Sequence, residues 1–179
     1  MTKRKDSTIA ALLEEKPKRG RPRRAVQRQN VYVALTPLEK KRIRDMGARL
    51  PEGLGRADIP DLATNLLSIR LEVLRQAVAD RNREIPEGIT DIESLYLLWD
   101  LPVPSDNGER KWTSIRLSPQ RVIELGRVRG ILNALFGVNR SQVFDLSLAL
   151  FDQFLDREST DKRVTSVEEA IDWITSIYL

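Results

Sequence analysis

Two segments of the chain alternate apolar and polar residues with the period of a β-strand that buries one face. They lie 82 positions apart and read NVYVALTP at 30–37 and WTSIRLSP at 112–119. Alternation places one set of side chains in the core and the other set on the surface. The predicted inward side chains are Val31, Val33, Leu35, Thr113, Ile115 and Leu117.

Each predicted strand leads directly into a predicted helix. Thr36 and Ser118 are suited to the N-cap, and Pro37 and Pro119 to the first helical position. Glu39 completes a capping box with Thr36. Apolar residues then recur at the three-and-four spacing of a buried helical stripe, at the same offset in both halves. They are Ile43, Met46 and Leu50 in the first half and Leu125, Val128 and Leu132 in the second.

A turn and a second helix follow in both halves. The first of these helices is predicted to start near Asp58, and the second with a capping box from Asn139 to Gln142. A third helix ends each half, because Thr90 to Glu93 and Thr165 to Glu168 are Thr-x-x-Glu boxes. The sequence therefore predicts a strand–helix–helix–helix unit used twice. The predicted domains are a tail at 1–29, a first unit at 30–100, a linker rich in Pro and Gly at 101–110, and a second unit at 111–179.

The composition excludes most enzyme classes. The chain has no Cys and no His, which removes disulfides, zinc sites built on those ligands and the usual nucleophile–base pairs. It also lacks a glycine-rich phosphate loop and a DxD-like cluster, so we expect no catalytic residue, no metal site and no cofactor. A carboxylate–magnesium nuclease is the one enzyme class left open. No apolar run approaches the roughly 18–20 residues of a membrane span, so we expect a cytoplasmic protein without a membrane partner.

The charge is concentrated in the N-terminal tail. Residues 1–29 hold ten basic and three acidic residues, or +7, which leaves −3 for the other 150 residues of a chain with net charge +4. The segment has few apolar residues that could pack, and its two prolines interrupt helices. We therefore expect it to be disordered on its own. At its centre the run KPKRGRPRR at 16–24 resembles an AT-hook, whose core is Arg19, Gly20, Arg21 and Pro22.

The resemblance implies contact with the minor groove of A·T-rich DNA. Gly20 has no side chain to collide with the groove floor, and Pro22 favours an extended Arg21. The narrow groove has a strong negative potential that attracts arginine. We expect the flanking basic residues to contact phosphates; these are Lys18, Arg23 and Arg24. The alternative is a solvated basic tail or a localisation signal.

The repeated unit resembles the ribbon–helix–helix family of bacterial, phage and plasmid DNA-binding proteins. The likeness covers residues 30–78 and 111–156, and Gly137 to Ser141 is similar to the family's turn into its second helix. It implies a mainly α fold with a two-stranded antiparallel β-ribbon, in which two units of one chain form a pseudo-dimer and each is followed by an extra helix. It also implies that the ribbon enters the major groove of double-stranded DNA.

Alternation then assigns the residues that face the groove. They are Asn30, Tyr32 and Ala34 on the first strand and Trp112, Ser114 and Arg116 on the second. Arginine pairs with guanine, asparagine with adenine, and serine with several bases. For Tyr32 and Trp112 the alternative to base contact is packing on the protein surface under the tail or a third helix.

Phosphate contacts are expected at the start of the second helix of the second half, from Asn139, Arg140 and Ser141. The first half departs from the family here, because Asp58, Pro60 and Asp61 add acid and remove an amide. The sequence thus predicts a sequence-selective, nucleoid-associated DNA-binding protein that acts as a transcriptional repressor. The expected site has A·T-rich flanks, and self-association of chains on DNA is left open. Plasmid segregation, a conjugative relaxosome accessory role and an antitoxin-type interaction protein remain as alternatives.

Overall fold

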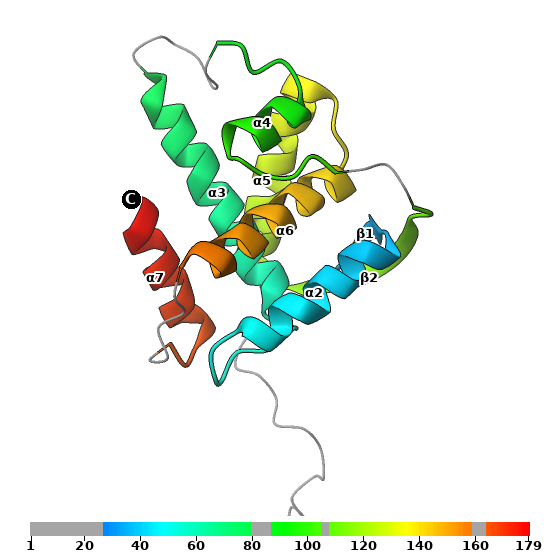
Figure 1. The fold of residues 1–179 in the computed structure, drawn as a ribbon, viewed down its shortest axis with the longest axis vertical. Helices are drawn as coiled ribbons and strands as arrows, with labels where there is room; N and C mark the ends of the chain where they lie inside the picture. The colour runs from blue at the N-terminus through cyan, green and yellow to red at the C-terminus, as the bar shows by residue number, and fades with distance from the viewer. Residues whose placement is uncertain (1–26, 80–86, 105–107, 159–163) are drawn as a thin grey trace, which may run out of the picture.

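The computed structural model describes residues 27–79, 87–104, 108–158 and 164–179, and Figure 1 shows their arrangement. The predicted AT-hook lies outside these ranges. The described residues form two strands and six helices, a mainly helical fold with one small sheet. In chain order they are β1 (Gln29–Leu35), α2 (Pro37–Arg49), α3 (Ile59–Ala77), α4 (Ile92–Leu98), β2 (Lys111–Leu117), α5 (Pro119–Phe136), α6 (Arg140–Arg157) and α7 (Val167–Tyr178).

The two strands pair with each other in antiparallel orientation, as the alternation and the family resemblance predict. Val31 lies opposite Ile115, and Leu117 lies opposite Gln29. The predicted inward side chains are buried, except Thr113, which is half-buried. A two-stranded ribbon cannot stand alone in water, so the apolar face must be covered by helices. The ribbon thereby joins residues 29–35 to residues 111–117.

Four helices begin at the N-cap residues expected from the sequence, and in two of them the cap side chains form a capping box. Thr36 and Glu39 form the predicted capping box of α2, and Asn139 and Gln142 form that of α6. Ser118 is the N-cap of α5, although its side chain makes no capping hydrogen bond in the described chain. Asp58 occupies the N-cap position of α3, where the sequence predicts the helix to start.

The predicted caps of the two third helices are wrong by one residue. Asp91, not Thr90, caps α4 by accepting a hydrogen bond from the amide of Ser94. Ser166, not Thr165, caps α7 by accepting from the amide of Glu169. Both alternatives are good capping residues, and the two that cap, Asp91 and Ser166, have the extended backbone typical of an N-cap.

The helices of the two halves pack across each other. α2 lies on α6, α5 lies on α3, and α3 crosses α6 at the centre of the molecule. The largest side chains that are less than 2% exposed, Phe144 and Phe151, both come from α6. Residues 59–69 of α3 are buried all round, polar side chains included. One hydrophobic core therefore serves residues from both halves.

The third helices contact both halves of the repeat. α7 packs on α3 of the first half, on the side of the molecule away from the ribbon in Figure 1. The end of α4 is held by Gln153 of α6, whose amide donates to the carbonyls of Trp99 and Asp100. Arg70 of α3 joins the two ends, because its guanidinium lies 5.4 Å from the ring of Trp99 and 5.1 Å from that of Tyr178.

Candidate nucleic-acid interface

The six predicted groove-facing residues lie on one face of the ribbon as three cross-strand pairs. Asn30 lies opposite Arg116, Tyr32 opposite Ser114, and Ala34 opposite Trp112. Five of the six are exposed and Ala34 is half-buried. The opposite face carries the apolar residues of the core, so this face is the one that the fold leaves open. The register therefore assembles residues from positions 82 apart into one surface.

Two large aromatic side chains stand out from this face. Tyr32 is 59% exposed and Trp112 is 75% exposed. Within the described ranges no third helix covers either ring, which excludes that part of the packing alternative. Two neighbouring aromatic side chains that remain exposed make this face a candidate contact surface. They lie on adjacent cross-strand pairs, so they would enter the same contact.

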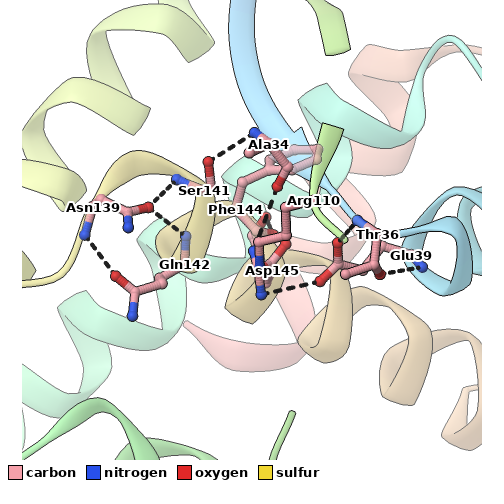
Figure 2. Close-up of polar contacts among 10 residues, drawn as sticks. Ala34, Thr36, Glu39, Arg110, Asn139, Ser141, Gln142, Phe144 and Asp145 are labelled. Atoms are coloured by element: carbon pink, nitrogen blue, oxygen red, sulfur yellow. Dashed lines mark hydrogen bonds and ion pairs between the residues drawn. The ribbon is translucent and has the colours of Figure 1, made fainter. Parts of the chain in front are cut away.

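Arg28 and Arg110, 82 positions apart, flank the ribbon and are committed to ion pairs. Arg28 donates to Asp58 at 2.7 Å and to Asp61 at 2.9 Å. Arg110 pairs with Asp145 at 2.5 Å and with Glu39 at 3.5 Å (Figure 2). Each arginine thus clamps the start of one strand to helices beside the ribbon. Arg116, in contrast, is exposed and forms no ion pair within the described residues.

The amides at the ribbon ends are also occupied. The Ala34 amide donates to Ser141 Oγ at 2.8 Å, and the Ser118 amide donates to Asp61 Oδ1 at 2.8 Å. The end of β1 is therefore held by the start of α6, and the residue after β2 is held by the start of α3. These two hydrogen bonds link the ends of the ribbon to α6 and α3.

The start of α6 is less open to a phosphate than the sequence predicted. The amides of Ser141 and Gln142 donate to Asn139 Oδ1, and the amide of Asn139 donates to Gln142 (Figure 2). Ser141 is buried, and its hydroxyl is used by Ala34. Asn139 and Arg140 are exposed. A phosphate at this helix would have to displace the Asn139 cap, so Arg140 is the side chain best placed to bind one.

Sequence reasoning missed a basic groove beside β2. It has a volume of about 680 Å³ and lies between β2, α2 and the turn before α3. Its cationic side chains are Lys40, Arg44, Arg56 and Arg116. The signal was present in the repeat, because the 82-residue offset matches Lys40 to Val122 and Arg44 to Gly126. The two halves therefore differ in charge at equivalent helical positions.

Burial raises the pKa of Asp145 to about 7, with Glu39 adding to the shift and Arg110 opposing it. Burial raises the pKa of Asp61 as well, against the lowering effect of the Ser118 amide and Arg28. The folded protein therefore holds a proton on Asp145 at pH values where the unfolded chain has lost it. This carboxyl group lies where the ribbon meets α2 and α6.

We expect the free energy of unfolding to fall as the pH rises from about 4 to about 7. Across this window the folded state binds more protons than the unfolded state, so Asp145 contributes up to about 1.4 kcal/mol per pH unit. Asp145→Asn should flatten this dependence, because the amide cannot titrate and still accepts a hydrogen bond from Arg110. Urea unfolding at pH 5, 6, 7 and 8 measures it. An unchanged slope in the variant would contradict the assignment.

The remaining predicted site residues, Lys18, Arg19, Gly20, Arg21, Pro22, Arg23 and Arg24, lie outside the described residues. In the part of the chain that is described, no group of three or more metal-ligating side chains occurs. The same part contains no helix with the length and apolar character to cross a bilayer. Comparisons with family models, with curated proteins and with solved structures found no match.

Proposed function

We propose that the chain is a sequence-selective double-stranded DNA-binding protein whose two ribbon–helix–helix units form a pseudo-dimer. One observation supports this most directly: the six side chains assigned to the groove from the sequence lie on one face of a paired ribbon. A two-stranded ribbon fits the width of the major groove. The buried opposite face gives the ribbon a rigid base, which base readout requires.

The side chains on this face match the chemistry of base edges. Arg116 can donate two hydrogen bonds to the O6 and N7 of guanine, and Asn30 can pair with adenine. These two residues lie opposite each other in the register, so they would read neighbouring positions. Ser114 adds a hydroxyl that both donates and accepts. Tyr32 and Trp112 supply apolar contact next to these polar groups.

The two strands carry different residues, so the two half-sites should differ in sequence. A symmetric homodimer reads a palindrome, and this ribbon would not. The AT-hook adds a contact in the minor groove next to the ribbon's site, and joining two weak modules in one chain raises the affinity of both. Binding of this kind next to a promoter suits a transcriptional repressor, which we propose as the role.

Selection of bound duplexes from a random library tests the proposal. We expect enrichment of one asymmetric motif with an A·T-rich flank on one or both sides. A palindromic motif would mean that two chains pair their ribbons. Recovery of no motif, with affinity that depends only on salt, would contradict sequence-selective binding. A chain with Arg116→Ala and Asn30→Ala serves as the control and should enrich a weaker or shorter motif.

A further inference from the structure

The basic groove beside β2 contains no acidic side chain among the described residues that line it. Its walls combine the cations Lys40, Arg44, Arg56 and Arg116 with an apolar floor from Leu35, Ile43 and Ile115. Arg44, Arg56 and Arg116 are exposed, and Lys40 is half-buried. Arg116 belongs both to this groove and to the exposed face of the ribbon. The groove is therefore continuous with the proposed base-reading surface.

The cations of this groove are available for a ligand. Lys40, Arg44 and Arg56 form no ion pair with another residue of the described chain. On another face of α2, Arg42 pairs with Asp152 at 2.8 Å, and Arg49 contacts Asp152 and Asp156. One face of the helix is thus neutralised within the fold and the other is not. Positive charge gathered without a counter-charge favours an anion.

The charge lies on one side of the ribbon only. At the 82-residue offset, Lys40 corresponds to Val122, Arg44 to Gly126, and Arg116 to Ala34. The side of the ribbon next to β1 therefore has uncharged residues where the side next to β2 has three cations. Differences of this kind between the halves of a repeat do not follow from packing, because all three cations are at least partly exposed.

The start of α3, beside this groove, is unsuited to hold a phosphate through its amides. Pro60 lacks an amide proton, and Asp58 and Asp61 place two carboxylates at the helix start. Both carboxylates are engaged by Arg28, and Asp61 also accepts from the Ser118 amide. A phosphate on this side needs other donors, and Arg56 lies two residues before Asp58 at the start of the helix.

We propose that the basic groove holds the phosphate backbone of the DNA strand that flanks the ribbon on its β2 side. Lys40, Arg44 and Arg56 replace the helix amides as donors, while Arg140 is the main contact on the β1 side. This inference rests on the proposed function. It implies more phosphate contacts on the β2 side of the ribbon than on the β1 side. Phosphate contacts fix the position of a protein on the duplex, so the groove sets which way the asymmetric ribbon faces.

The first experiment compares two variants of the full chain with equal net charge. Lys40→Gln with Arg44→Gln removes two cations of the groove, and Lys41→Gln with Arg129→Gln removes two exposed cations elsewhere. Binding to the selected duplex is titrated at several salt concentrations. Each phosphate that the protein no longer neutralises reduces the slope of log K against log salt by about 0.9. Because this variant removes two of the three phosphate donors, we expect a reduction of about 1.8, and for the control variant little change.

The second experiment locates the contact on the DNA. Neutral methylphosphonate linkages are placed on one flank of the selected site or on the other. We expect methylphosphonates on one of the two flanks to weaken binding of the unsubstituted protein strongly. The same methylphosphonates should have a much smaller effect on binding of the groove variant. Equal effects of the two flanks, or a groove variant that behaves as the control, would overturn the inference while leaving the proposed function intact. Failure of the unsubstituted protein to bind any duplex would contradict both.

Discussion

Leu117→Ala should lower the free energy of unfolding by roughly 2–5 kcal/mol, the range for truncation of a fully buried leucine. Leu117 is completely buried at the end of β2, opposite Gln29. The amide of the next residue, Ser118, donates to Asp61, which restrains the backbone against moving inward to fill the cavity. Urea unfolding followed by circular dichroism measures the loss.

Two matched variants show whether this effect belongs to the buried face. Leu35 is the equivalent residue of β1 and is also buried, so Leu35→Ala should cost a similar amount. Trp112→Ala removes a larger side chain from the exposed face and should cost less than about 1 kcal/mol, as most surface substitutions do. A larger loss for Trp112→Ala than for Leu117→Ala would mean that the two faces are reversed, which a register slip of one residue would produce.

Arg116→Ala should weaken binding to the preferred duplex by on the order of 1–3 kcal/mol, and binding to random DNA much less. Arg116 is exposed on the ribbon opposite Asn30 and is not neutralised by a carboxylate within the described residues. Under the proposed function, its loss removes a contact to a base edge, and the exposed position leaves the core undisturbed. Competition titrations with the selected duplex and with random duplex measure both affinities. Equal losses of affinity for the selected duplex and for random duplex would show that Arg116 contacts only the phosphate backbone of the DNA.

Substitutions in the tail provide the contrasting control. Arg19→Ala with Arg21→Ala should weaken binding to sites with A·T-rich flanks and have little effect on sites with G·C-rich flanks, because the narrow minor groove of A·T tracts attracts arginine. Equal losses on both flanks would reduce the tail to an electrostatic contribution. The ribbon variant should retain the preference for A·T-rich flanks, so the two modules can be measured separately.

The elements with a strong local signal were predictable from the sequence. The period of two in residues 30–35 and 112–117 assigned each side chain to the correct face, because burial of one face requires that pattern. The caps at Thr36 and Asn139 were predictable because both hydrogen bonds of a capping box form within four residues. The third helices show the limit of this reasoning. Thr90 and Asp91 are both capping residue types, so the local pattern alone does not distinguish them, and Asp91 is the one that caps.

Contacts between distant segments were decided by the tertiary structure alone. The sequence did not indicate that Ser141 would bind the amide of Ala34, that Arg28 would pair with Asp61, or that α7 would pack on α3. These contacts join residues that lie far apart in the chain, so they form only when the segments that carry them pack against one another. The basic groove has the same origin, since α2, the turn before α3 and β2 meet only after packing. Local patterns thus determined the elements and their faces, and packing determined which faces meet.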